Sequence, residues 1–339
     1  MKTIVLEQPG HLAFGQSVSP AASSAAEAVV RVRRIGVCGT DLHAFRGRQP
    51  FFTYPRILGH ELGIEIAAIE PNESGLRVGD RCAVEPYLNC GHCVACRAGK
   101  TNCCVSLRVL GVHTDGGMQE YISVPPDKLH RSEVLTCEQL AVVEPLSIGA
   151  HAVERAQLRD GEFTLVIGAG PIGLAVIQFA QLKKARVIVM DVNEGRLAFS
   201  REHYRTAATA NVQTDDAIAK LKAITGDDMP TAVFDATGNA DSMRQAFNLV
   251  AHGGRLIFVG LVQADVTFHD PDFHRRELTV LGSRNSTGAD FRRIIALMES
   301  GRININPWIT HRIPFAETVD RFPDWLNPEA GFIKGIVEL

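Results

Sequence analysis

The glycine-rich segment G-A-G-P-I-G at residues 168–173 constrains the fold most, because it separates an apolar strand-like run from an apolar helical pattern. An acidic residue, Asp191, ends the next strand-like run 18 positions beyond the last glycine of the motif. A dinucleotide-binding Rossmann unit requires a strand before the glycine motif, a helix after it and an acidic residue at the end of the next strand. The first glycine allows the tight turn, the second admits a pyrophosphate, and the third lets helix and strand pack closely. The alternative is an ordinary glycine-rich turn.

The expected cofactor is NAD. The carboxylate of Asp191 would accept hydrogen bonds from the adenosine ribose and repel a 2′-phosphate, which favours NAD over NADP. Arg196 could stack on adenine or be a solvated helix residue. The residues expected at the cofactor are Gly168, Gly170, Pro171, Ile172, Gly173, Asp191, Arg196, Val259, Gly260, Leu261 and Ser283.

Strands and helices alternate closely from about residue 148 to 286, which favours a parallel sheet covered on both faces. The expected strands are Phe163–Ile167, Arg186–Met190, Thr231–Asp235, Arg255–Val259 and Leu278–Leu281, and the expected helices are Ile172–Lys183, Glu194–Tyr204, Asp216–Ile224 and Asp241–Ala251. The first 147 residues differ, because they contain short β-rich runs (Ala28–Arg33, Gly63–Ile69 and Arg81–Val84) and a Ser/Ala-rich segment, Ser17–Ala28, interpreted as a surface loop. After a helix near Asp290–Glu299, β-like fragments could return to the first domain.

Composition excludes several classes of protein. The chain has 339 residues, 45% of them hydrophobic and 22% charged, which suits a folded protein of two domains. A net charge of -3 with scattered Lys and Arg argues against a nucleic-acid or anionic-membrane surface. No apolar stretch follows the N-terminal lysine as in a secretory signal, so we expect a cytoplasmic protein. The uncharged segment 163–182 is long enough to span a membrane, but its glycines and proline favour a strand, a turn and a helix.

Four of the eight cysteines have the spacing C-x2-C-x2-C-x7-C, which indicates a closed tetrahedral zinc site of structural type. An iron–sulfur cluster is the main alternative, but the fourth cysteine is distant and no proline follows it. The adjacent Cys103 is a rival for the fourth position. The expected ligands are Cys90, Cys93, Cys96 and Cys104.

A second constellation is spread along the chain: Cys38 in V-C-G-T-D, His60 and Glu61 in L-G-H-E, and Glu144 in V-V-E-P-L. One thiolate, one imidazole and one or two carboxylates match a catalytic zinc site that keeps a position open for substrate. Each residue alone is weak evidence, because a lone buried cysteine or histidine is usually structural. Spacing alone does not bring these segments together.

The combination of motifs resembles the zinc-containing medium-chain dehydrogenases, and within them the polyol branch of sorbitol, galactitol and L-threonine dehydrogenases and their sugar-acid relatives. The resemblance covers nearly the whole chain, in family order. Two stretches, Q-P-F-F-T-Y-P-R-I-L-G-H-E and L-G-S-R-N-S-T, are especially similar to sugar-acid members of L-galactonate dehydrogenase type. The matching segments are 37–43, 54–61, 78–86, 90–104, 111–121, 143–152 and 166–174.

The resemblance implies a GroES-like, mainly β catalytic domain formed by residues 1–147 and 287–339, with the Rossmann domain inserted as residues 148–286. It implies that Cys38, His60 and Glu61 hold a catalytic Zn²⁺, with Glu144 bound directly or through water. The glutamate at position 144, where the simple-alcohol branch has cysteine, favours the polyol branch. The resemblance also implies a homotetramer or a homodimer, and the composition does not choose between them.

The resemblance also assigns supporting roles. Thr40 and His43 lie where the family has its proton relay, and Asp41 would fix the tautomer of His60. Arg284 lies where polyol relatives contact cofactor and substrate. Loops around Phe51, Phe52 and His113 would form pocket walls. Simpler interpretations are an exposed loop histidine for His43 and a turn residue for Thr40.

The expected activity is zinc-dependent hydride transfer between a secondary alcohol, either a polyol or a sugar acid such as galactonate, and NAD. The alternatives are an L-threonine-type or simple alcohol dehydrogenase, an alkene or quinone reductase, and a non-catalytic zinc- or dinucleotide-binding regulator. Reductases of this architecture normally lack the zinc ligands, which argues against that alternative. One departure concerns packing: the family pattern H-E-x-x-G has Ile64 at its glycine position here, with Gly63 before it.

Overall fold

The computed structural model describes residues 1–20, 26–50, 52–327 and 331–339. Residues 21–25 of the predicted loop Ser17–Ala28 and the predicted pocket residue Phe51 lie outside these ranges. The chain divides into two compact units, one made of Met1–Pro145 with Ser286–Leu339 and the other of Leu146–Asn285. We refer to them as unit 1 and unit 2.

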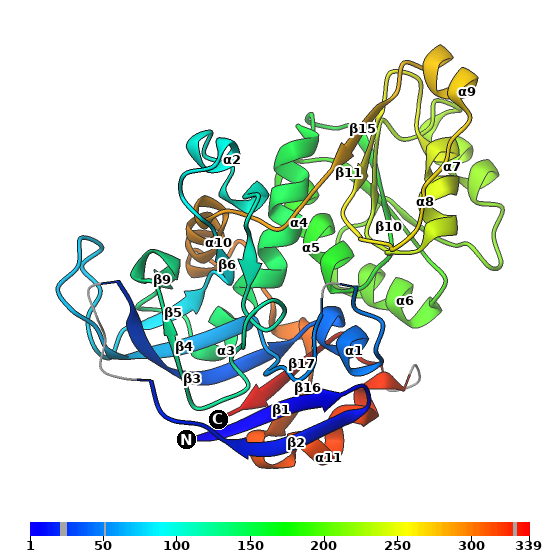
Figure 1. Ribbon diagram of the computed structural model, residues 1–339. Coiled ribbons are helices and arrows are strands. Elements are labelled where there is room, and N and C mark those ends of the chain that lie inside the picture. The colour runs from blue at the N-terminus through cyan, green and yellow to red at the C-terminus, as the bar shows by residue number, and fades with distance from the viewer. Residues whose placement is uncertain (21–25, 51, 328–330) are drawn as a thin grey trace. The chain divides into compact units, whose positions relative to one another are not determined.

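Unit 2 is an α/β unit with helices such as α5, α6 and α8 around its strands (Figure 1). Within the described residues, six strands form one parallel sheet in the order β12-β11-β10-β13-β14-β15. From β10 the chain adds strands on one side and then returns to start β13 on the other side. This reversal is the doubly wound Rossmann arrangement. Its elements are β10 (Phe163–Ile167), α5 (Pro171–Leu182), β11 (Arg186–Asp191), α6 (Glu194–His203), β12 (Ala208–Asn211), α7 (Ala217–Thr225), β13 (Ala232–Asp235), α8 (Ala240–Ala246), β14 (Arg255–Phe258), α9 (Asp270–Arg275) and β15 (Thr279–Gly282).

The structure confirms the predicted Rossmann fold, and the five predicted strands are present with ends shifted by at most about one residue. Strand β12 and helix α9 were not predicted. The predicted helix Asp241–Ala251 is too long, since α8 ends at Ala246 and a 3-10 turn follows. Asp216 is not in α7 but caps it, because its carboxylate accepts the Ala219 N–H at 3.0 Å.

The apolar stretch 163–182 divides into β10, a turn and α5. Every described residue of both elements except the first of β10 and a few at the start and end of α5 is buried. Continuous apolar sequence is expected where a parallel strand and its covering helix are both buried. In the part of the chain that the structure describes, none of the helices is long and apolar enough to span a membrane.

Unit 1 is mainly β, as predicted for the domain around the inserted Rossmann unit. Its largest sheet has the order β16-β17-β3-β4-β5-β9, with β8 also pairing with β3. The elements are β1 (Lys2–Gln8), β2 (His11–Gln16), β3 (Ala28–Val37), α1 (Gly39–Phe45), β4 (Glu61–Ala68), β5 (Arg81–Val84), β6 (Tyr87–Leu88), α2 (Val94–Arg97), β7 (Arg108–Val109), β8 (Tyr121–Val124), β9 (Leu129–Arg131), α3 (Cys137–Ala141), α10 (Gly288–Glu299), β16 (Ile309–Pro314), α11 (Thr318–Arg321) and β17 (Lys334–Glu338), while helix α4 (Val143–Ala156) runs across the boundary between the units.

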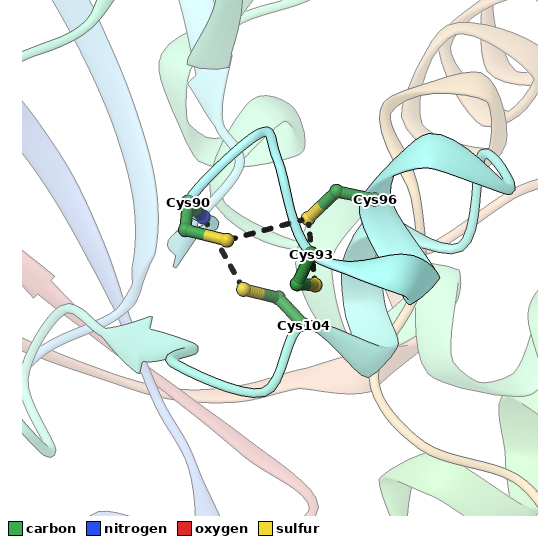
Figure 2. A group of neighbouring side chains, drawn as sticks. All are labelled: Cys90, Cys93, Cys96 and Cys104. Atoms are coloured by element: carbon green, nitrogen blue, oxygen red, sulfur yellow. Dashed lines mark hydrogen bonds between the residues drawn. The ribbon is translucent and has the colours of Figure 1, made fainter.

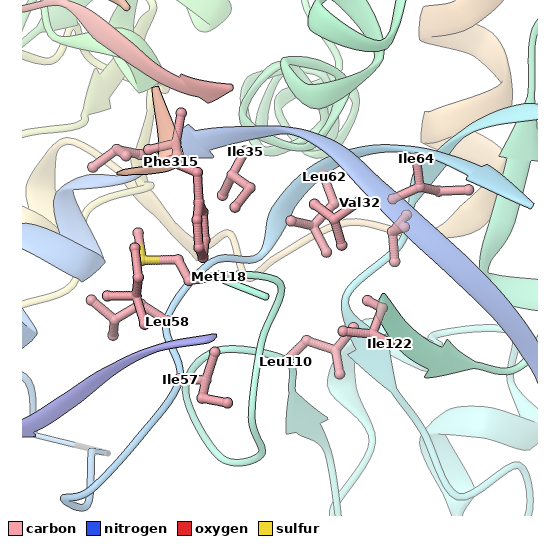
Figure 3. Close-up of a cluster of buried hydrophobic side chains, with 14 of the residues drawn as sticks. Val32, Ile35, Ile57, Leu58, Leu62, Ile64, Leu110, Met118, Ile122 and Phe315 are labelled. Carbon is pink, nitrogen blue, oxygen red and sulfur yellow. The ribbon is translucent and has the colours of Figure 1, made fainter. Parts of the chain in front are cut away.

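The C-terminal strands join the N-terminal ones, because β17 pairs antiparallel with β3 and parallel with β16. The last strand of the chain therefore belongs to the same sheet as β3 and β4. Side chains from β3, β4 and the loops around residues 57–58 and 110–118 fill the core of unit 1 (Figure 3). Full burial of one such Leu or Ile contributes about 1.5–3 kcal/mol.

This core explains why isoleucine occupies position 64, where the family pattern H-E-x-x-G has glycine. Ile64 is fully buried within it, whereas a Cβ on Gly63 would lie 1.8 Å from the Cys137 carbonyl oxygen. Gly63 thus provides the close approach between β4 and α3, and Ile64 fills the core on the opposite face of the strand.

Candidate metal and cofactor sites

The end of β3 and the starts of β4 and β17 lie together, at the edge of the unit 1 sheet where these strands end or begin. Strand β3 is antiparallel to both β4 and β17, so the end of β3 lies beside the starts of the other two. Cys38 follows β3, and Glu61 begins β4 directly after His60. One ligand atom each from Cys38, His60 and Glu61 lie within 4.8 Å of one another. The structure therefore brings together three residues that are separated by up to 23 positions in sequence.

Glycines make this convergence possible. Gly36 pairs with Glu61 across β3 and β4, and a Cβ on it would lie 2.1 Å from the Glu61 Oε2 atom. Gly59 has a φ of +94°, and its carbonyl accepts the Gly117 N–H at 2.8 Å. A Cβ on Gly116 would lie 2.3 Å from that same carbonyl oxygen. These contacts explain the glycines of L-G-H-E and D-G-G-M, because only glycine fits such close backbone packing.

Asp41 supports both neighbouring ligand residues. Its Oδ2 atom accepts the Cys38 N–H at 2.9 Å, and its Oδ1 atom lies 3.6 Å from the His60 Nδ1 atom. Burial disfavours the charged imidazole, but Asp41 and Cys38 outweigh burial and raise the pKa of His60 well above its usual value. With Nδ1 turned toward Asp41, the Nε2 atom of His60 is the one available to a metal ion.

Glu144 lies beside this group but is not among its three members. Its Oε1 atom accepts a hydrogen bond from the Tyr87 hydroxyl, and both side chains are buried. Burial raises the pKa of Glu144 to about 7, with Glu61 adding to the shift and His60 and Tyr87 opposing it. Two buried carboxylates and a thiol in one place favour a cation among them, so the donor set fits a zinc ion.

Lys334 was not predicted as part of the site. It is the first residue of β17 and is 1% exposed. Its ammonium nitrogen lies 2.6 and 2.8 Å from the two carboxylate oxygens of Glu61. Burial disfavours its charge, but Glu61 and Cys38 outweigh this and raise the pKa of Lys334. Lys334 is a single polar residue within the apolar run F-I-K-G-I-V, and neither it nor Tyr87 carries a sequence signal for this site.

The remaining predicted catalytic residues lie in different parts of the fold. Thr40 and His43 are on α1, which starts directly after Cys38. His43 is exposed, yet partial desolvation and the nearby cations of Arg46 and Arg48 lower its pKa, so the neutral imidazole is favoured. Arg284 is exposed in the segment between β15 and α10 and belongs to unit 2.

Two of the three predicted pocket-wall residues are described. Phe52 packs against the core of unit 1 and forms an edge contact with Tyr54, with ring centroids 4.9 Å apart. The Nδ1 atom of His113 lies 3.1 Å from the backbone nitrogen of Val109. Both side chains therefore have structural contacts within unit 1.

The cysteine loop forms a second group of potential ligands around α2 (Figure 2). The sulfur atoms of Cys90, Cys93, Cys96 and Cys104 lie within 4.8 Å of one another. Cys104 is buried and belongs to this group, whereas Cys103 is exposed. Backbone N–H groups of Cys96 and Val105 donate to the Cys93 sulfur and lower its pKa to about 6. Four thiols with no open position suit a closed zinc site.

Replacing Cys93 by serine should remove one zinc per chain and lower the unfolding midpoint by roughly 5 °C or more, because such sites contribute folding free energy. Zinc analysis and calorimetry of the purified variant measure both effects. Cys103→Ser is the matched control and should change neither. Loss of zinc in the Cys103 variant would mean that the fourth ligand has been misassigned.

In unit 2, the glycine-rich turn connects β10 to α5. Gly168 has a φ of +93°, and a Cβ on Gly173 would lie 1.7 Å from the Gly168 carbonyl oxygen. The first and third glycines thus have the turn and packing roles expected of them. Pro171 and Ile172 form the first turn of α5, and Gly170 is its N-cap. The N–H groups at this end have no partner within the helix and can bind an anion.

The other predicted cofactor residues lie at the same carboxyl edge of the parallel sheet. Asp191 ends β11, and its carboxylate accepts the N–H groups of Ala169 at 2.6 Å and Asn193 at 2.8 Å. This edge, at the reversal between β10 and β13, is where doubly wound sheets bind ligands. Arg196 is exposed on α6, Val259, Gly260 and Leu261 follow β14, and Ser283 follows β15.

Comparisons with known proteins agree with this fold. A family model described as "Alcohol dehydrogenase GroES-like domain" matches residues 24–134, and one described as "Zinc-binding dehydrogenase" matches residues 171–300. The chain is 40% identical to the L-galactonate-5-dehydrogenase of Escherichia coli K12, over 99% of this chain and 98% of that protein.

Solved structures of dehydrogenases have the same fold as this chain. An alcohol dehydrogenase from E. coli CFT073, in complex with NADH, superposes with a TM-score of 0.91 at 30% identity, over 100% of this chain and 99% of the other. A zinc-binding dehydrogenase from Sinorhizobium meliloti bound to NADP gives 0.90 at 29%, with coverage of 100% and 99%. The chain therefore belongs to the zinc-binding dehydrogenase family, whose members are oxidoreductases with a GroES-like and a Rossmann domain.

Proposed function

We propose that the chain is a zinc- and NAD-dependent dehydrogenase that oxidises a secondary hydroxyl of a sugar acid. The observation that carries this proposal is the convergence of Cys38, His60 and Glu61 within 4.8 Å at one sheet edge. A thiolate, an imidazole and a carboxylate leave one position of a tetrahedral zinc site for substrate. In this proposal unit 1 holds the metal and unit 2 binds NAD.

When bound, zinc would lower the pKa of a substrate hydroxyl and NAD would accept the hydride from its carbon. The protein's own groups hold the reactants. Cys38, His60 and Glu61 would bind the metal, with Glu144 directly or through water, and Asp41 fixes the orientation of His60. Tyr87 fixes Glu144 through its hydroxyl.

Thr40 and His43 would carry the hydroxyl proton to solvent. The lowered pKa of His43 leaves its imidazole neutral and able to accept that proton near neutral pH. The products are then a keto acid, NADH and one proton. We further propose a homotetramer or homodimer in the cytoplasm.

A sugar acid is preferred to a neutral polyol as the substrate because of the 40% identity to an L-galactonate-5-dehydrogenase over nearly the whole chain. The test is NADH formation from NAD across sugar acids, neutral polyols, L-threonine and simple alcohols, repeated after chelation. Chelator-sensitive turnover of sugar acids would support the proposal. Turnover of neutral polyols alone would contradict the substrate class, and a folded, zinc-loaded sample without NADH binding would contradict the catalytic function.

Arg284 provides a sharper test of the substrate class. Its guanidinium can bind a carboxylate with two hydrogen bonds, whereas a neutral polyol offers no such partner. Arg284→Ala should therefore lower kcat/KM for the sugar acid by about tenfold or more and change that for a neutral polyol much less. Steady-state kinetics with both substrates on the same preparation provide the internal control. Equal losses on the two substrates would contradict carboxylate recognition by Arg284.

A further inference from the structure

The ammonium group of Lys334 donates hydrogen bonds to a residue of the candidate zinc site, Glu61, and to the backbone next to Cys38. Its ammonium group lies 2.6 and 2.8 Å from the Glu61 oxygens and 3.2 Å from the Val37 carbonyl oxygen. A lysine ammonium has three N–H donors, and these three acceptors match them. The side chain is 1% exposed and that of Glu61 is fully buried, so water does not screen the pair.

The position of this lysine follows from the sheet. Gly335 pairs with Val37 between β17 and β3, and Gly36 pairs with Glu61 between β3 and β4. Lys334 therefore reaches Glu61 across the end of β3, the strand that Cys38 follows. The glycine at position 36 leaves room for the carboxylate between the two strands. The ion pair is thus built into three neighbouring strands rather than formed by mobile surface side chains.

The acidic groups buried around this pair explain why a cation is stable there. Glu61, Glu144 and Asp41 are all buried beside Cys38 and His60. Negative charge in such a place is unfavourable unless a cation compensates it. Lys334 supplies one such cation, hydrogen-bonded to both oxygens of Glu61.

The same contacts limit how strongly Glu61 can bind a metal. Each of its oxygens already accepts a hydrogen bond from a cation, so a metal ion must share those oxygens and lies close to a second positive charge. We propose that Lys334 is a positioning residue that restrains Glu61, making it a weak and exchangeable zinc ligand so that the substrate hydroxyl can compete for the metal. This inference rests on the proposed function, because it assumes that zinc binds at Cys38, His60 and Glu61.

The test compares Lys334→Met with Lys334→Arg and the unchanged protein, using zinc alone and a competing chelator, dipicolinate. A Cys38→Ser variant identifies the zinc that belongs to this site, since the cysteine-loop zinc remains. Lys334→Met should hold this zinc at least about tenfold more tightly, because Glu61 is released and a repelling cation is lost. Its kcat should fall by about tenfold or more, and Lys334→Arg should restore both values to within about threefold.

A purely structural lysine would not give this result. Lys128 is the matched control, because it is also a buried lysine of unit 1, 2.8 Å from a carboxylate oxygen of Glu85. Lys128→Met should lower stability without tightening the zinc of the Cys38 site. Unchanged or weaker zinc binding in folded Lys334→Met, or tighter binding with unchanged kcat, would overturn the proposal.

A double variant covers the case in which Lys334→Met does not fold, since it would leave Glu61 buried and unpaired. Glu61→Gln/Lys334→Met should bind zinc at most about threefold more tightly than Glu61→Gln, because Lys334 acts mainly through Glu61 and only its repulsion of the metal ion is then lost. A gain of about tenfold or more in the double variant over Glu61→Gln would overturn the proposal. If the unchanged protein binds no zinc that depends on Cys38, the proposed function itself fails, and this result is distinct from the others.

Discussion

Replacing Cys38 by serine should lower turnover at least about a thousandfold and remove one zinc per chain, the effect expected from losing a group that stabilises developing charge. Serine has nearly the same shape but presents a neutral hydroxyl in place of a thiolate, which zinc binds far more strongly. Cys38 follows β3 as the N-cap of α1, and its N–H is held by Asp41. The substitution should therefore change the donor atom while leaving the backbone in place.

The measurement combines NADH formation with zinc analysis of the purified variant. Cys82→Ser is the control, because Cys82 is a fully buried cysteine of β5 in the same unit and belongs to neither group of potential ligands. It should lose some stability and keep both zinc ions and most of its activity. Full zinc content together with full turnover in the Cys38 variant would rule out this residue as a ligand.

The Rossmann unit was predictable because its signals are local. Each strand of the unit 2 sheet except β12 is an apolar run next to a helical pattern or a glycine-rich turn. Strand β12 has the sequence A-T-A-N and lies at the sheet edge, where a short polar segment is stable through pairing with β11 alone. Its sequence offers neither alternation nor an apolar run, so sequence patterns could not indicate it.

The candidate metal site was predictable only in part, because its residues meet through long-range strand pairing. The types of Cys38, His60 and Glu61 indicate zinc chemistry, but their convergence depends on the neighbouring positions of β3 and β4. Lys334 comes from a third strand, β17, and is separated from Glu61 by 273 positions in the sequence. A lysine within an apolar strand usually indicates an exposed edge, and only the antiparallel pairing of β17 with β3 shows that this one is buried.

Replacing Asp191 by asparagine should lower kcat/KM for NAD by about a hundredfold and reduce the preference for NAD over NADP by at least about tenfold. The carboxylate holds the glycine-rich turn through the N–H groups of Ala169 and Asn193. Asparagine keeps one acceptor oxygen but turns an NH2 group toward one of these donors, which disturbs the turn. It also removes the negative charge that disfavours a 2′-phosphate.

The ratio of kcat/KM for NAD to kcat/KM for NADP separates a disturbed turn from the loss of repulsion of the 2′-phosphate. NAD and NADP share the pyrophosphate that the turn would contact, so a disturbed turn should weaken both cofactors to a similar degree and leave the ratio of their kcat/KM values unchanged. Loss of repulsion acts on NADP alone. Asp216→Asn is the control, because Asp216 caps α7 in the same unit and asparagine is an equally good cap. If kcat/KM falls equally for both cofactors, Asp191 only supports the turn, and the preference for NAD has to come from another residue beside the ribose.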